Sequence, residues 1–190
     1  MAVSFSAVVL AAGRSTRMGA DKALLHAGGR PLWERQRDVL VAAGASEVFL
    51  SVRPDQAWAH EAPGFSGLIH DALPDCGPIV GLSAGLERMS HRHLAVLAID
   101  LPELTEEWFR ELAAAASPGQ GLVGRIGRYF EPLAAIYPVE LKWLAWETIA
   151  RGEYSLQAML GAAVKQGLMR VREIGSAETR WFRNWNEPAG

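Results

Sequence analysis

Short apolar runs alternate with longer helical patterns along this chain, and that alternation constrains the fold more than any other feature. The two strongest runs, Ser6–Leu10 and His93–Asp100, are nearly continuous in apolar residues, as expected for strands that are covered on both faces of a parallel sheet. Weaker strand patterns lie at Glu47–Val52, Gly67–Asp71, Pro132–Tyr137 and Leu168–Ile174. Helical patterns lie at Pro31–Ala43, Pro78–Met89, Thr105–Ala116, Leu141–Ala150 and Leu156–Gln166. The order predicts βαβ units, and therefore an α/β fold with a mainly parallel sheet.

Length and composition exclude several classes of protein. The chain has 190 residues, which predicts a single domain over residues 1–190. Hydrophobic residues make up 49% and charged residues 21%, so the chain is not disordered. The net charge of −2 argues against a nucleic-acid binder, which needs a basic excess. A single cysteine, Cys76, excludes an intramolecular disulfide and points to a reducing, cytoplasmic compartment. No apolar run approaches the ~18 residues of a membrane span, and no secretory signal is recognisable.

The glycine-rich loop after the first strand is the richest candidate site. Ligands of open α/β sheets bind beyond the carboxyl ends of the strands, so the loops after Leu10, Asp71 and Ile99 are where a site is expected. Glycines allow backbone amides to form a concave anion site, and Arg17 and Lys22 can balance phosphate charge. The spacing matches neither a P-loop nor a G-x-G-x-x-G motif. Taken alone, the loop could equally be a solvated turn.

Two aspartates follow strands on this same expected edge. Asp100 comes at the end of a buried run, a suitable place for a carboxylate that holds Mg²⁺ on a triphosphate. Asp71 ends the weaker strand pattern of Gly67–Asp71. A turn or capping role is the alternative for both residues.

The complete loop sequence, Leu10 to Lys22, resembles the signature of the small nucleotidyltransferases, L-A-[AG]-G-x-S-x-R-M-G-x-[DP]-K. With Asp21 before Lys22, the chain is similar to the molybdenum cofactor guanylyltransferase family. The resemblance continues along most of the chain, at Arg30–Leu32, His70–Asp71, Gly77–Leu82, Ala98–Pro102, Pro132–Tyr137, Gly152–Leu156 and Phe182–Pro188. It implies a three-layer αβα, Rossmann-like fold of the nucleotide-diphospho-sugar transferase type.

The resemblance also implies an activity. Members of the family transfer GMP from GTP to Mo-molybdopterin with Mg²⁺, giving the guanine dinucleotide cofactor and pyrophosphate. The implied catalytic residues are Arg17, Lys22 and Asp100, with Asp100 as the Mg²⁺ ligand. The implied nucleotide contacts are Leu10, Ala11, Ala12, Gly13, Ser15, Lys22, Asp71 and Asp100, with Asp71 reading guanine. Asn184 and Asn186 are expected near the acceptor or the metal. Implied partners are small-molecule substrates, with transient contact to molybdoenzymes or other cofactor-biosynthesis proteins, and neither nucleic acid nor membrane.

The sequence departs from the guanylyltransferase pattern at Ala12, Ser51 and Glu187, where glycine, asparagine and threonine are usual. The alternatives are therefore a molybdopterin cytidylyltransferase or another small enzyme that transfers a nucleotide to a phosphate acceptor, such as a sugar phosphate or methylerythritol phosphate. A nucleotide-binding module without turnover and a cofactor-delivery protein also remain.

Other conspicuous residues have simpler interpretations. His91 and His93 are predicted to lie in a solvated turn rather than to bind a metal, because no suitable third ligand is near in sequence. Cys76 is expected to be a small packed thiol. Trp143 and Trp146, three residues apart, predict a core contact or a partner-binding face.

Overall fold

The computed structural model describes residues 2–13, 21–70, 73 and 76–185. Its main sheet has the order β5-β4-β1-β6-β8-β7-β9. These strands are β1 (Ser6–Leu10), β4 (Val48–Val52), β5 (Gly67–His70), β6 (His93–Ala98), β7 (Gly121–Ile126), β8 (Tyr129–Pro138) and β9 (Met169–Glu173). Only the pairs β6–β8 and β7–β8 of this described sheet are antiparallel. The expectation of a mainly parallel sheet is confirmed.

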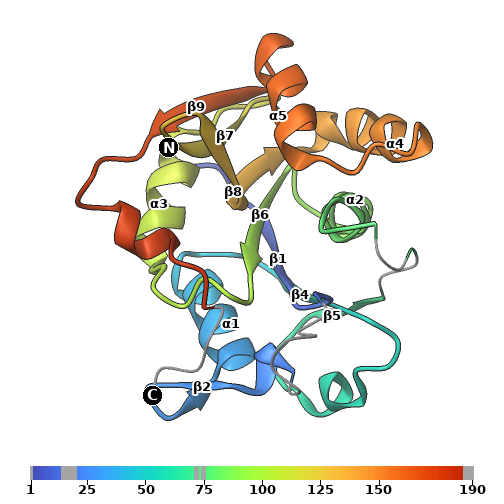
Figure 1. The fold of residues 1–190 in the computed structure, drawn as a ribbon, viewed down its shortest axis with the longest axis vertical. Helices are drawn as coiled ribbons and strands as arrows, with labels where there is room; N and C mark the ends of the chain where they lie inside the picture. The colour runs from blue at the N-terminus through green and yellow to red at the C-terminus, as the bar shows by residue number, and fades with distance from the viewer. Residues whose placement is uncertain (1, 14–20, 71–72, 74–75, 186–190) are drawn as a thin grey trace.

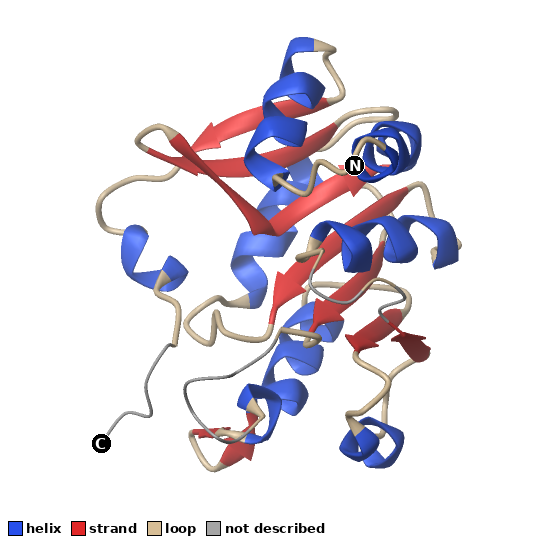
Figure 2. Cartoon of the chain, turned by 45° about the vertical axis from the view of Figure 1, so that its right-hand side comes forward, coloured by secondary structure: helices blue, strands red, loops and turns tan. Residues whose placement is uncertain are grey.

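Helices cover both faces of the sheet, which gives the predicted three layers (Figures 1 and 2). The helices are α1 (Leu32–Ala42), α2 (Ile79–Arg88), α3 (Glu106–Ala115), α4 (Lys142–Ala150) and α5 (Leu156–Lys165). One buried cluster joins the sheet to α1 and α3, and the other joins it to α2, α4 and α5. Helix α5 begins where predicted, because the Ser155 side chain accepts a hydrogen bond from the amide of Ala158.

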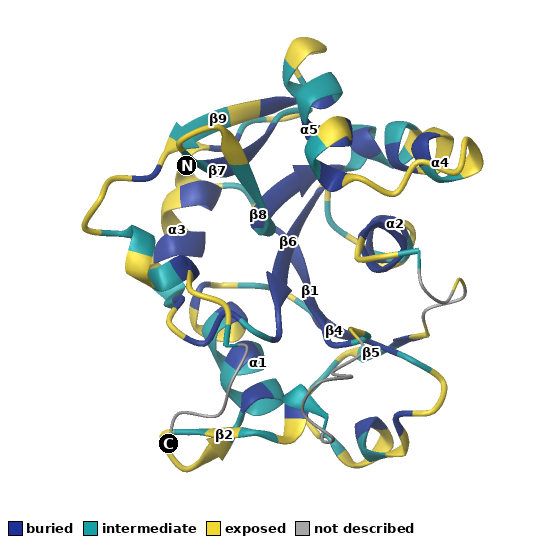
Figure 3. Cartoon of the chain, viewed as in Figure 1, coloured by how far each residue is buried: buried dark blue, intermediate teal, exposed yellow. Residues whose placement is uncertain are grey.

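The alternation of side chains along β1 explains its apolar sequence. Ala7 and Val9 pack into the cluster of α1 and α3, whereas Val8 and Leu10 pack into the cluster of α2. All four are buried (Figure 3). A strand that is covered on both faces cannot alternate between apolar and polar residues, so its sequence reads as a continuous apolar run.

The strand order reverses beside β1. From β1 the chain adds β4 and then β5 on one side, and it next crosses to β6 on the other side. Both neighbours are parallel to β1, with Val9 opposite Leu50 and Leu97. The carboxyl ends of these three strands therefore meet at a switch point, where α/β sheets bind their ligands.

The structure adds strands that the sequence patterns did not predict. β7 was missed, and β8 is longer than the predicted Pro132–Tyr137 because it forms a hairpin with β7 across Gly127 and Arg128. Gly127 has φ +59°, a conformation that suits glycine at a tight turn. A second small hairpin pairs β2 (His26–Ala27) with β3 (Arg30–Pro31) just before α1.

One side-chain prediction is wrong, and for another one of its two alternatives is excluded. His93 does not lie in a solvated turn: it is the first residue of β6, is buried, and its Nε2 lies 3.0 Å from the carbonyl oxygen of Ser117. Trp143 and Trp146 are 72% and 57% exposed on α4, which excludes the predicted core contact and leaves the alternative of a partner-binding face. Cys76 is half-buried and packs against the cluster of α2, as expected.

Among the residues that the structure describes, no helix has the length and apolar character needed to cross a membrane.

Candidate active site

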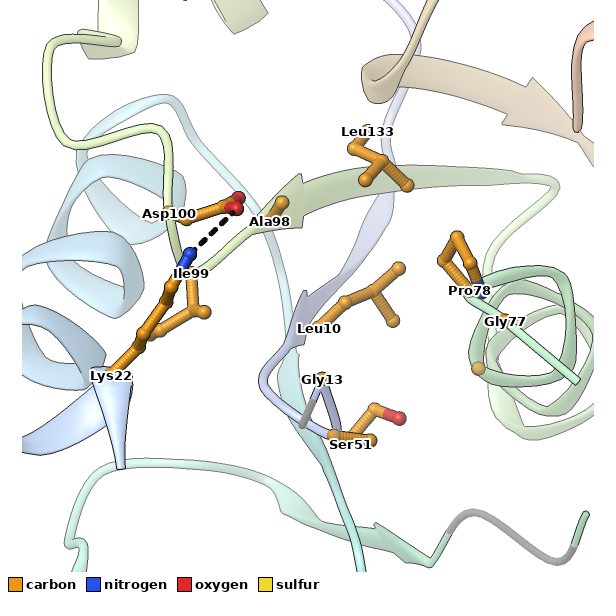
Figure 4. A pocket seen from close by; sticks show the side chains of 12 residues that line it. Leu10, Gly13, Lys22, Ser51, Gly77, Pro78, Ala98, Ile99, Asp100 and Leu133 are labelled. Carbon is orange, nitrogen blue, oxygen red and sulfur yellow. Dashed lines mark ion pairs between the residues drawn. The ribbon is translucent and has the colours of Figure 1, made fainter. Parts of the chain in front are cut away.

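A cavity of about 300 Å³ opens at the carboxyl ends of β1, β4 and β6 (Figure 4). This is the edge on which the sequence predicted a site. The lining residues are Leu10, Ala12, Gly13, Lys22, Ser51, Gly77, Pro78, Gly81, Ala98, Ile99, Asp100 and Leu133. They combine an apolar wall with one cation, one carboxylate and one hydroxyl, as expected for a small-molecule site.

Lys22 and Asp100 place opposite charges together at this cavity. Lys22 Nζ lies 3.6 Å from Asp100 Oδ2, and the two side chains are 18% and 25% exposed. Asp100 follows β6 directly, while Lys22 opens the 3₁₀ helix η1 (Lys22–Leu24) beyond the glycine-rich loop. The fold thus joins two groups that are 78 positions apart in numbering, one suited to phosphate and one suited to a cation.

A divalent cation bound between protein and phosphate fits this donor set better than a cation held by protein alone. Within the described ranges, no three His, Cys, Asp or Glu side chains cluster. The carboxylate of Asp21 already accepts three hydrogen bonds, from Gln56, Trp58 and the amide of Ala23. One carboxylate matches Mg²⁺, which commonly takes one or two carboxylates and completes its shell with phosphate oxygens and water.

The far wall of the cavity depends on a close approach between strand and helix. A Cβ atom on Gly81 would lie 2.8 Å from Leu10 Cδ2 and 2.9 Å from Ser51 Oγ. Glycine is therefore needed for α2 to pack against β1 and β4 at this point. Gly77, at φ +75°, and Pro78 bring the N-terminus of α2 to the cavity, where free backbone amides favour negative charge.

Ser51 carries an unused hydrogen-bonding group at the cavity. The residue is buried, and its Oγ has no hydrogen-bond partner among the described residues. A buried hydroxyl without a partner is costly. Because Ser51 also lines the cavity, a bound ligand can provide the missing partner.

A buried glutamine fixes the turn that carries Asp100. Gln36 on α1 is fully buried, and its Nε2 donates to the carbonyls of Ala98 and Leu101 at 2.9 and 3.0 Å. The turn is therefore held from both sides of Asp100. No local sequence pattern predicts that Gln36 holds this turn, because it lies 62 positions before Ala98.

Apart from Asn184, the predicted site residues divide into three groups. Leu10, Ala12, Gly13, Lys22 and Asp100 line the cavity together. Ala11 does not line it: its side chain packs in the core, its amide donates to Ser51 O and its carbonyl accepts from Gln56. The remaining predictions, at Ser15, Arg17, Asp71 and Asn186, lie outside the described residues.

The C-terminal segment reaches the same edge of the sheet. The amide of Trp185 donates to the carbonyl of Asp100 at 2.9 Å. Asn184, the preceding residue, is exposed. The segment thus brings a predicted acceptor-side residue to the neighbourhood of Asp100.

Known proteins resemble this chain over most of its length. Residues 7–168 match the family described as MobA-like NTP transferase domain. A protein of Opitutus terrae named "Probable molybdenum cofactor guanylyltransferase" is 38% identical, with 98% of this chain and 93% of that protein covered. A Pseudomonas putida protein named "Molybdenum cofactor guanylyltransferase" is 32% identical, with 96% and 93% covered.

Solved structures show the same fold. The molybdopterin-guanine dinucleotide biosynthesis protein A of Archaeoglobus fulgidus superposes with a TM-score of 0.74 at 23% identity, covering 96% of this chain and 93% of that one. A nucleotidyl transferase from Methanothermobacter gives a TM-score of 0.76 at 18% identity, with 96% and 92% covered. From the family match and the full-length relatives, the chain belongs to the MobA-like NTP transferase family and is a nucleotidyltransferase.

Proposed function

We propose that this enzyme transfers GMP from GTP to the phosphate of Mo-molybdopterin and releases pyrophosphate. The observation that carries the proposal is the meeting of Lys22 and Asp100 at the cavity beyond β1 and β6. The full-length relatives are named molybdenum cofactor guanylyltransferase, which supports a guanylyl group as the unit transferred and the molybdenum cofactor as the acceptor.

The chemistry needs no nucleophilic side chain. An oxygen of the acceptor phosphate attacks the α-phosphorus of GTP and forms the new P–O bond. The bond from that phosphorus to the bridging oxygen breaks, and its electron pair leaves with pyrophosphate. The protein then has to position two anionic substrates and stabilise the charge that grows on the leaving group. Lys22 serves that charge, and Arg17 is proposed to do the same.

The proposed metal belongs at Asp100. Bound Mg²⁺ would supply charge neutralisation across the phosphates. Asp100 would hold it with one carboxylate, and the hydrogen bonds of Gln36 to the adjacent carbonyls keep that carboxylate at the end of β6. Lys22, which pairs with Asp100 here, would then be directed toward phosphate oxygens.

Guanine selection is assigned to Asp71. A carboxylate can accept hydrogen bonds from guanine N1–H and from the 2-amino group at once. Cytosine and adenine offer one exocyclic donor beside a ring nitrogen that is an acceptor. Either base would leave one carboxylate oxygen without a hydrogen bond, so the site would reject both. The unpaired hydroxyl of Ser51 offers a further contact on the nucleotide side.

The test measures pyrophosphate release with molybdopterin, Mg²⁺ and each of the four nucleoside triphosphates. We expect release with GTP, and an Asp71→Ala variant should lose base preference more than it loses turnover with the poor nucleotides. A preference for CTP by about tenfold, or about 1.4 kcal/mol, would make the enzyme a cytidylyltransferase. Nucleotide binding without any pyrophosphate would instead support a binding or delivery protein.

A further inference from the structure

We propose that Gln56 and Trp58 are positioning residues for Lys22, acting through the carboxylate of Asp21. The inference rests on the proposed role of Lys22 as a phosphate contact. It concerns two residues, from the segment after β4, that do not line the cavity and that no family signature in the sequence singled out.

The first observation is the set of donors around Asp21. Gln56 Nε2 and Trp58 Nε1 both donate to Asp21 Oδ2, at 2.5 and 2.8 Å. The other oxygen, Oδ1, accepts from the amide of Ala23 at 3.1 Å and so caps the 3₁₀ helix that Lys22 opens. Hydrogen bonds to a carboxylate are stronger than neutral ones. The backbone on both sides of Lys22 is therefore held by one side chain.

The second observation is that Gln56 also holds the end of β1. The residue is only 4% exposed. Besides Asp21, its Nε2 donates to the carbonyl of Ala11 at 3.0 Å, and its Oε1 accepts from the amide of Arg53 at 2.7 Å. A single buried carboxamide thus joins residue 11, residue 21 and the turn after β4, fixing the two flanks of the loop that carries the family signature.

Arg53 strengthens the same attachment. Its Nη1 donates to the carbonyls of Ala12 and Gly13 at 3.1 and 3.0 Å. Side chains from residues 53–58 therefore reach the start of the loop through Arg53 and Gln56, and its end through Gln56 and Trp58. Three side chains of this one segment thus bond to the two ends of the loop.

The consequence for catalysis concerns where Lys22 points. Its ammonium reaches Asp100 at 3.6 Å (Figure 4). The backbone from which it extends is the one that Asp21 fixes. A charge that stabilises a leaving group must be held within about half an ångström of its productive position. The hydrogen bonds that support the charged side chain keep it there. The part of the effect of Gln56 and Trp58 that acts through Lys22 must disappear once the lysine itself is gone. For Trp58, which bonds only Asp21 among the contacts above, that is the whole effect.

That condition defines the experiment, a double-mutant cycle read by calorimetry with GTP and Mg²⁺. Trp58→Phe keeps the ring and removes the indole donor, and Gln56→Ala removes the carboxamide. We expect each to weaken GTP binding by about fivefold in the wild-type background. In a Lys22→Ala background, Trp58→Phe should not change the Kd by more than about twofold. Gln56→Ala should lose less affinity there than in the wild-type background, and the loss that remains reflects its bond to the carbonyl of Ala11. Gln120→Ala is the control and should leave GTP affinity unchanged. It removes a side-chain hydrogen bond to the carbonyl of Gly167, at the opposite edge of the sheet.

The outcomes separate this inference from the proposed function. Equal losses in both backgrounds, or no loss in either, would overturn the positioning role. If Gln56→Ala fails to fold, the cycle with Trp58→Phe decides alone. A wild-type protein that prefers CTP would correct only the base, and the cycle is then run with CTP. A wild-type protein that binds no nucleotide would overturn the proposed function and this inference together.

Discussion

The amide of Trp185 donates a hydrogen bond to the carbonyl of Asp100, the residue proposed to hold the metal. The segment before Trp185 is anchored firmly to the rest of the fold. Phe182 packs edge-on against Trp108 of α3 at 4.9 Å between ring centroids. Glu178 pairs with Arg172 of β9 at 2.7 Å. The segment up to Trp185 is therefore fixed beside the site, which supports an acceptor-side role for Asn184.

Lys22→Ala should weaken nucleotide binding and slow turnover. Charge-assisted contacts are worth about 1.5–3 kcal/mol, so the Kd for GTP should rise by about ten- to hundredfold. Calorimetry with GTP and Mg²⁺ measures the change. Lys142→Ala is the matched control, because Lys142 also lies near a carboxylate, 4.0 Å from Glu87, but on α4 away from the cavity. Unchanged affinity in Lys22→Ala would remove this lysine from the phosphate site.

Asp100→Asn should separate binding from chemistry. The side chain keeps its size but loses the charge proposed to hold Mg²⁺. We expect GTP to bind weakly, while pyrophosphate release falls by at least about a hundredfold, as for lost transition-state charge stabilisation. Asp38→Asn, at a carboxylate of α1 paired with Arg30 and Arg37, should leave release unchanged. Full activity in Asp100→Asn would place the metal elsewhere.

Gly81→Ala tests the close approach at the back of the cavity. The added Cβ would crowd Leu10 and Ser51 at under 3 Å, so side chains that line the cavity must shift. Overpacking of this kind costs about 1–3 kcal/mol of stability, and GTP affinity should fall with it. Gly161→Ala on α5 has open space around it and should stabilise the protein by about 0.5–1 kcal/mol without changing affinity. Thermal melts measure the stability of both variants, and calorimetry measures their affinity for GTP. If Gly81→Ala binds GTP as tightly as the wild type, this wall of the cavity does not contact the nucleotide.

The parts of the site that could be predicted from sequence are those with a local signal. Asp100 ends a buried apolar run, and Lys22 closes a glycine-rich loop, so both were placed on the correct edge of the sheet. Gln36, Gln56 and Trp58 carry no such signal. Their hydrogen bonds join residues 35 to 65 positions apart, and only the folded chain shows which carbonyl or carboxylate each donor meets.

The missed strand β7 has a similar physical cause. Gly121 and Gly124 lower its strand propensity, so the run does not read as a strand. The fold needs both residues to be glycine. A Cβ on Gly121 would lie 2.2 Å from the carbonyl oxygen of Ile136, and one on Gly124 would lie 2.6 Å from Ile174. Close tertiary packing against β8 and Ile174 therefore requires glycine here, although glycine has a low strand propensity.

Glu131 on β8 predicts a pH dependence of stability. Burial raises the pKa of its carboxyl from 4.5 to about 7, because the charged form loses hydration. Between about pH 4.5 and 7 the folded protein keeps a proton that the unfolded chain releases, so stability is complete below this window and falls as the pH rises through it. Glu131→Gln removes the ionisation and should therefore be more stable than the wild type at pH 8, with the advantage lost at pH 4.

The side chain is only half-buried, so solvent screening limits the effect to about 1 kcal/mol, or roughly 2–4 °C in Tm for a chain of this size. Melting curves of both proteins from pH 4 to pH 8 give the measurement. The exposed Glu153→Gln should follow the wild type across the range. A Tm difference between Glu131→Gln and wild type that stays constant with pH would show that the Glu131 carboxyl is as well hydrated in the folded protein as in the unfolded chain.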